Sequence, residues 1–118
     1  MLISPHYSFE SFKNTEYYDN QDGIKTIHLK KAEIIDNRKY MVNLFFLNKE
    51  IYVVSLICCD CVFSAKNEHQ RKQLHDKILK ENGINQKNKY AWGKIESNYD
   101  KRSNLSSIDI IYTKGAAI

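Results

Sequence analysis

The sequence predicts a single α+β domain spanning residues 1–118, an antiparallel sheet of about five strands in the order β-β-β-α-β-β with one long helix packed on one face. Three observations predict this class. The length of 118 residues is that of one domain. Five stretches are rich in β-branched and aromatic residues and are separated by turn residues. One stretch, between the third and the fourth of these, repeats its apolar residues at a helical period.

The first 23 residues, here called the leader, combine aromatic with polar side chains and have no strong periodicity. A short helical turn is expected around residues 8–13. The run Asn20-Gln21-Asp22-Gly23 reads as a turn that closes the leader.

Three strands are expected next, over residues 24–35, 39–47 and 51–59. The turn residues 36–38 and 48–50 fit hairpin loops between them, so the three strands should form an antiparallel meander. The third strand is apolar on both faces, which is typical of a strand in the centre of a sheet.

The expected helix follows, with Ser64 or Asn67 as N-cap and Asn82-Gly83 as its C-terminal stop. It covers about 16 residues, which is long enough to cross one face of a sheet. One apolar stripe should face that sheet, made of Ala65, Leu74, His75, Ile78 and Leu79.

The last two strands are expected over residues 92–98 and 105–113, joined by a loop over 99–104. Ile108, Ile110 and Tyr112 alternate with more exposed positions. Trp92 is expected in the core, and Gly93 at a bulge or a close approach of two backbones.

The composition excludes several classes of protein. Hydrophobic residues make up 42% of the chain and aromatic residues 12%, which is too much for a disordered chain. No apolar run approaches the roughly 20 residues that span a bilayer, and no signal peptide is visible, so a cytoplasmic protein is expected. The net charge of +4 comes mainly from lysine, whereas readers of nucleic acid rely on arginine, so no nucleic-acid partner is expected.

No catalytic residue, metal site or cofactor is expected from the motifs. Cys58, Cys59 and Cys61 form an odd, clustered set at the end of an apolar strand, which indicates small packing residues rather than disulfides. The cysteine and histidine spacing lacks the second ligand pair that a zinc site needs. The phosphate-binding, nucleophile-elbow and zinc-hydrolase motifs are all missing from the sequence.

Two surfaces are candidates for binding another protein. In the leader, tyrosines lie beside acidic residues, a combination that suits a basic partner such as a nuclease toxin. The second surface is the loop that joins the last two strands. The candidate residues are Glu16, Tyr17, Tyr18, Asp19 and Asp22 in the leader, and Tyr99, Asp100 and Arg102 in the loop.

The C-terminal part resembles a known family. The stretches Tyr-Ala-Trp-Gly-Lys-Ile-Glu-Ser-Asn-Tyr-Asp at 90–100 and Ser-Ser-Ile-Asp-Ile-Ile-Tyr at 106–112 are similar to the C-terminal pattern of immunity proteins of bacterial polymorphic toxin systems, which include contact-dependent growth inhibition. The resemblance covers about residues 38–113 and leaves the leader unmatched. It implies a protein that binds one cognate secreted toxin tightly and neutralises it, without catalytic residues of its own.

Three alternatives stay open from the sequence. The first is a small nucleic-acid-binding protein, which predicts a sheet face lined by lysine and tyrosine. The second is a small enzyme that uses the cysteine cluster, which predicts a thiol close to an imidazole. The third is a structural subunit of a phage or secretion assembly. The sequence does not determine the oligomeric state.

Overall fold

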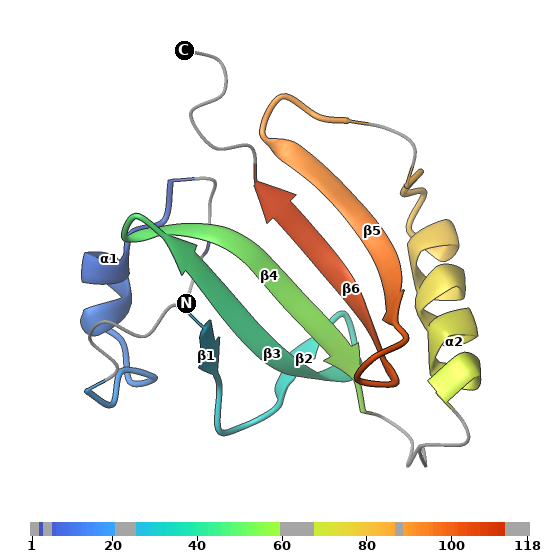
Figure 1. Cartoon of the computed structure of the whole chain (residues 1–118), viewed down its shortest axis with the longest axis horizontal. Coiled ribbons are helices and arrows are strands. Elements are labelled where there is room, and N and C mark those ends of the chain that lie inside the picture. Colours follow the sequence, from blue (N-terminus) through green and yellow to red (C-terminus); the bar gives the residue numbers. More distant parts are fainter. Residues whose placement is uncertain (1–2, 4–5, 21–25, 60–67, 87–88, 113–118) are drawn as a thin grey trace.

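A computed structural model describes residues 3, 6–20, 26–59, 68–86 and 89–112. It confirms the α+β class, with a six-stranded antiparallel sheet and two helices, of which one is long (Figure 1). The elements are α1 (Phe9–Lys13), β1 (Thr26–His28), β2 (Glu33–Ile35), β3 (Arg38–Leu47), β4 (Glu50–Cys58), α2 (Glu68–Glu81), β5 (Gly93–Asp100) and β6 (Leu105–Tyr112).

The strands lie in the order β1-β3-β4-β6-β5, and β2 pairs with the other end of β3. The central position predicted for the third apolar strand is therefore confirmed, because β4 lies between β3 and β6. In Figure 1, α1 lies beside the β3–β4 hairpin at one end of the sheet, and α2 lies beside β5 at the other end. Neither described helix is long and apolar enough to cross a membrane.

The single strand expected over 24–35 is wrong. Two short strands occur instead: His28 pairs with Asn43 in β1, and Glu33 pairs with Tyr40 in β2. Between these pairs, the four residues 29–32 face only two residues of β3, so the ladder is interrupted as at a wide bulge. Residues 24 and 25 lie outside the described part of the chain.

Two tight turns set the register of the hairpins. Asp36 and Asn37 have φ values of 51° and 66°, and Asn48 and Lys49 have φ values of 52° and 66°. Two consecutive residues with positive φ make the turn type that matches the right-handed twist of an antiparallel pair. The turns therefore lie where the sequence predicts them, although each is shorter by one residue, because β3 begins at Arg38 and β4 begins at Glu50.

The long helix confirms its predicted stripe and its end. His75, Ile78 and Leu79 are buried, and Leu74 packs partly against the core. Gly83 has φ +69°, and the backbone N–H of Ile84 donates to the carbonyl of Leu79 at 2.9 Å, which closes the helix. The proposed N-caps Ser64 and Asn67 lie outside the described residues, as does Ala65.

The β5–β6 hairpin corrects two expectations. Tyr99 and Asp100 belong to β5, where they pair with Ser106 and Leu105, so the loop covers only residues 101–104. Trp92 is only half-buried: it stacks on the exposed ring of Tyr90, with the ring centroids 5.2 Å apart, and packs partly against the core.

The predicted close approach at Gly93 is confirmed. A Cβ atom added to Gly93 would lie 1.9 Å from the carbonyl oxygen of Ile111, so no other residue fits there without movement of the backbone.

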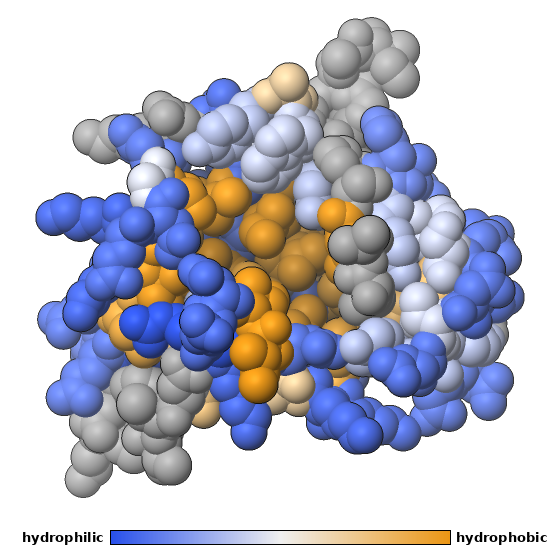
Figure 2. All heavy atoms as spheres, turned by 180° about the vertical axis from the view of Figure 1, so that it is seen from behind, coloured by the Kyte–Doolittle hydropathy of each residue, from blue (hydrophilic) through white to orange (hydrophobic). Residues whose placement is uncertain are grey.

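The core lies on one face of the sheet. Side chains alternate between faces along each strand, and both helices bury their apolar side chains on the same side. Figure 2 looks onto this helix-bearing face, where apolar side chains gather in a central hollow between polar margins. The buried core includes Phe12, Leu44, Phe46, Ile51, Val54, Leu79, Ile108 and Tyr112. The opposite face of the sheet is covered by neither described helix.

Candidate functional site

An open trough of about 550 Å³ runs across the face of the sheet that points away from the helices. Alternate residues of β4 face the trough and the core: Val53 and Ser55 point into the trough, whereas Val54 points into the core. Four apolar side chains give it an apolar wall: Phe45, Val53, Ile57 and Leu105. Its polar lining comes from His28, Asn43, Ser55, Asn98, Tyr99, Asp100, Ser103, Ser107 and Asp109.

Strand register brings four of these polar residues into one row. His28 lies opposite Asn43, Asn43 lies opposite Ser55, and Ser55 lies opposite Asp109. The row is held at one end by a hydrogen bond of 2.5 Å between Nδ1 of His28 and Oδ1 of Asn43. Asp109 is fixed by hydrogen bonds of 2.8 Å from Nδ2 of Asn98 and from Oγ of Ser107. These side chains are thus positioned in advance of any partner.

The charge of the trough is opposite to that of the whole chain. Asp100 and Asp109 line it, and none of the described residues that line it is a lysine or an arginine. The chain as a whole carries +4. A concave, partly apolar surface concentrates the field of such carboxylates, so this face favours positively charged partner groups.

The leader forms a second hollow of about 560 Å³. Glu16, Tyr17, Tyr18 and Asp19 line it, opposite Lys30, Lys31, Ala32 and Glu33 of the β1–β2 connection. Nζ of Lys30 lies 2.8 Å from Oδ2 of Asp19, and this hydrogen bond and charge lower the pKa of Asp19. The acidity expected of the leader is therefore partly balanced by lysines that the fold brings beside it.

The leader tyrosines also serve the fold. A hydrogen bond from the Tyr17 hydroxyl to Glu33 raises the pKa of Tyr17 to about 12. The ring of Tyr18 packs edge-on against Phe9 and Phe12, with centroid distances of 6.3 Å. Both tyrosines stay half-exposed, so they remain available at the rim of the hollow.

His28 lines both the trough and the leader hollow, and so joins the two surfaces predicted from the sequence. Tyr99 and Asp100 lie at the far end of the trough. Arg102 is exposed on the adjoining turn, where its backbone N–H donates to Oδ1 of Asp100 at 3.0 Å. Asp22 lies outside the described residues.

Sequence reasoning missed the residues at the centre of this surface. Asn43, Ser55 and Asp109 are polar residues in the middle of three apolar strands. These polar residues could have been noticed in the sequence, because a polar side chain within an apolar strand normally needs a hydrogen-bond partner. Only the register shows that the three positions lie side by side.

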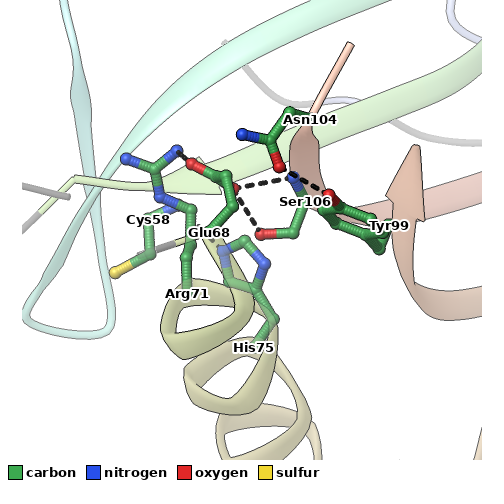
Figure 3. A network of polar contacts seen from close by, with 7 residues as sticks. All are labelled: Cys58, Glu68, Arg71, His75, Tyr99, Asn104 and Ser106. Atoms are coloured by element: carbon green, nitrogen blue, oxygen red, sulfur yellow. Dashed lines mark hydrogen bonds and ion pairs between the residues drawn. The ribbon is translucent and has the colours of Figure 1, made fainter. Parts of the chain in front are cut away.

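A separate, buried polar cluster joins α2 to the sheet (Figure 3). Oε2 of Glu68 accepts hydrogen bonds from the backbone N–H and the hydroxyl of Ser106, at 2.9 and 3.0 Å. Oε1 of the same carboxylate pairs with the Arg71 guanidinium at 2.5 Å, and both side chains are at most 10% exposed. Internal contacts occupy both oxygens of Glu68, which gives this cluster a structural role.

The cysteine-enzyme alternative requires a thiol beside an imidazole, but His75 contacts the backbone of Cys58, and the Cys58 sulfur points away from the ring (Figure 3). The backbone N–H of Cys58 donates to Nε2 of His75 at 3.1 Å, and both residues are fully buried. Burial, followed by the charge of Arg71, lowers the pKa of His75 to about 4. A neutral imidazole that accepts a backbone hydrogen bond cannot take a thiol proton through that nitrogen. Cys59 is half-buried, and Cys61 lies outside the described residues.

Within the described residues, no group of three histidine, cysteine or acidic side chains is arranged to hold a metal ion. Comparisons with protein-family models, curated proteins and solved structures find no significant match to this chain.

Proposed function

We propose that this chain is an immunity protein of the bacterial cytoplasm, which binds one cognate secreted toxin through the open face of its sheet and neutralises it without catalysis. The resemblance at residues 90–112 supplies the class of protein. We place the binding surface at the trough, because the trough combines an apolar wall with fixed polar groups on a face that neither described helix covers.

The composition of this face suits a protein partner. Interface centres combine aromatic and apolar anchors with a few positioned polar groups. Phe45 and Val53 would supply the apolar contact, and Asn98 and Asp109 would supply directed hydrogen bonds. With the leader hollow as one rim and the β5–β6 turn as the other, we expect an interface of standard size, about 1,600 Å² in total.

The charge of the trough favours a basic protein over a nucleic acid. Asp100 and Asp109 would repel phosphates, and none of the described residues that line the trough is a lysine or an arginine, whereas binding of nucleic acid predicts a lysine-rich face. A nuclease toxin, whose active site must attract phosphates, presents the opposite charge. The open face would therefore cover the basic surface of such a toxin.

The contacts of Cys58 and His75 support a non-catalytic role. Both are fully buried where α2 meets the sheet, and the imidazole nitrogen that could act as a base already accepts a backbone hydrogen bond. A nucleophile needs a path for substrate and a base within reach. The trough supplies no thiol, because none of the described residues that line it is a cysteine; its ionisable residues are His28, Tyr99, Asp100 and Asp109.

The test begins with a search of the neighbouring reading frames for a toxin domain, which is then coexpressed with this chain. We expect the full chain to restore growth and to bind the purified toxin with nanomolar affinity, measured by calorimetry. Val53→Arg, on the open face, should weaken binding at least 100-fold and abolish protection. Gln73→Arg adds the same charge on the exposed side of α2, so it should bind and protect as the unaltered chain does.

Each variant is compared with the unaltered chain by thermal melting before binding is measured. If Val53→Arg does not fold, Phe45→Ala replaces it and should weaken binding at least tenfold. Failure of the unaltered chain to bind or protect would contradict the proposed function. Full affinity of a folded open-face variant would contradict the choice of surface.

A further inference from the structure

Asp109 is a carboxylate that is held in place without a cationic partner among the described residues. Its two hydrogen-bond donors, Asn98 and Ser107, are both neutral. Among the described residues, no lysine, arginine or histidine forms an ion pair with it. Its cross-strand neighbour Glu96 differs, because Nζ of Lys94 lies 3.1 Å from its carboxylate. The full negative charge of Asp109 is thus held in place and left available in the trough.

Ser55 lies beside Asp109 in the trough and could bind the same ligand. It lies directly opposite Asp109, lines the trough and is only 7% exposed. Its side chain faces the trough beside that carboxylate, so its hydroxyl can accept a hydrogen bond from a group bound there. A cationic ligand that donates hydrogen bonds to both Ser55 and Asp109 would neutralise the carboxylate.

The walls of the trough select among cationic donors. Phe45 of β3 and Val53 of β4 lie opposite each other. They are two residues along their strands from the pair Asn43 and Ser55, and so point to the same face. An arginine side chain can lay its aliphatic stem and flat guanidinium against such a wall, and it offers five N–H donors in a fixed plane. A lysine ammonium is compact and strongly hydrated, so it would lose more solvation in the same place.

We propose that Ser55 and Asp109, walled by Phe45 and Val53, form a binding site for the guanidinium group of an arginine side chain. This inference rests on the proposed function only for the source of that arginine, which would be the bound toxin. The site itself belongs to this chain and is testable without the toxin.

The test is an NMR titration of the full chain with N-acetyl-L-arginine methylamide. Saturable shifts are expected for the backbone amides of Ser55 and Asp109 and for the side-chain amide of Asn98. The citrulline analogue has the same shape without the charge, and should bind at least tenfold more weakly. The lysine analogue should also bind more weakly than arginine. Equal shifts with citrulline, or shifts confined to other residues, would overturn the proposal.

Two variants assign the site. Asp109→Asn should weaken arginine binding at least tenfold, and Ser55→Ala should weaken it several-fold, which keeps the test decisive if one of them folds poorly. Asp36→Asn is the matched control, since it also removes one carboxylate but lies on the exposed turn between β2 and β3. Unchanged affinity in folded Asp109→Asn would overturn the site.

The two proposals can fail separately. Arginine binding by a chain that neutralises no toxin would leave the site intact and remove the proposed function. Full neutralisation of the toxin by Asp109→Asn, together with no saturable arginine binding, would remove the site and leave the proposed function.

Discussion

The carboxylate of Glu68 accepts two hydrogen bonds from Ser106, one from its backbone N–H and one from its hydroxyl, across 38 residues of sequence. This contact fixes the first turn of α2 against the start of β6. Because α2 covers one face of the sheet only, its attachment also determines which face stays open.

Glu68→Ala should lower the free energy of unfolding by about 3 kcal/mol, because it leaves the buried Arg71 guanidinium without its carboxylate. Urea denaturation measures this change. Glu81→Ala is the control: Glu81 pairs with Lys77 at 3.7 Å on the exposed end of the same helix, so its loss should cost less than about 0.5 kcal/mol. Equal losses in the two variants would be incompatible with a structural role for the buried cluster.

The stability of the chain should fall as the pH drops from about 6.5 to about 4, partly because of His75. Its pKa is about 4 in the folded protein and 6.5 in a freely exposed side chain. Between these values the unfolded chain binds a proton that the folded chain does not, so acid favours unfolding. The contribution of His75 is at most about 3 kcal/mol.

Urea denaturation at several pH values, compared between the unaltered chain and His75→Gln, isolates this contribution. The variant should be less stable at pH 7 but should lose less stability on acidification. His69→Gln, at an exposed position of the same helix, should keep the full pH dependence. An identical pH dependence in the unaltered chain and in His75→Gln would show that His75 is not the group responsible.

Gly93→Ala should lower the free energy of unfolding by more than about 3 kcal/mol, or prevent folding, because its Cβ would overlap the backbone of Ile111. Gly83→Ala meets open space and carries only the strain of φ +69°, so about 1 kcal/mol is expected. Thermal melting of both variants checks the difference. Melting of Gly93→Ala at or above the temperature of Gly83→Ala would mean that β5 and β6 are farther apart at this point.

Trp92→Ala should lower the free energy of unfolding by about 2 kcal/mol, less than the 3–5 kcal/mol that a fully buried tryptophan would cost. The ring is half-buried, lies 5.6 Å from the ring of Tyr112 and stacks on exposed Tyr90. Tyr90→Ala should cost less than about 1 kcal/mol. A loss above about 4 kcal/mol for Trp92→Ala would restore the sequence-based expectation of a core tryptophan.

The sequence predicted the class of the fold and most of its elements because these depend on local patterns. Apolar residues on both faces identified β4 as central, and the Asn82-Gly83 pair marked the end of α2. The break between β1 and β2 was missed, because residues 29–32 (Leu-Lys-Lys-Ala) contain no glycine, proline or other turn residue that would mark it, and only the pairing with β3 shows it.

The candidate site was harder to predict than the fold. The alternation of side chains tells which face a residue lies on, but the row of Asn43, Ser55 and Asp109 depends on register. Register in turn depends on the two-residue turn at Asn48 and Lys49 and on the irregularity between Phe45 and Phe46. The ion pair between Asp19 and Lys30 was missed for a similar reason. It joins the leader to the β1–β2 connection, and the sequence does not show that these two segments lie close together in the fold.

Methyl cross-saturation NMR of the complex between the labelled chain and its toxin tests the central claim most directly. Val53 and Ile111 lie opposite each other on the open face, whereas Ile78 and Leu79 of α2 are buried in the core on the other face. The account predicts that saturation of the toxin attenuates the methyl signals of Val53 and Ile111 and leaves those of Ile78 and Leu79 unchanged. Attenuation confined to residues of α2, with Val53 and Ile111 unaffected, would contradict it.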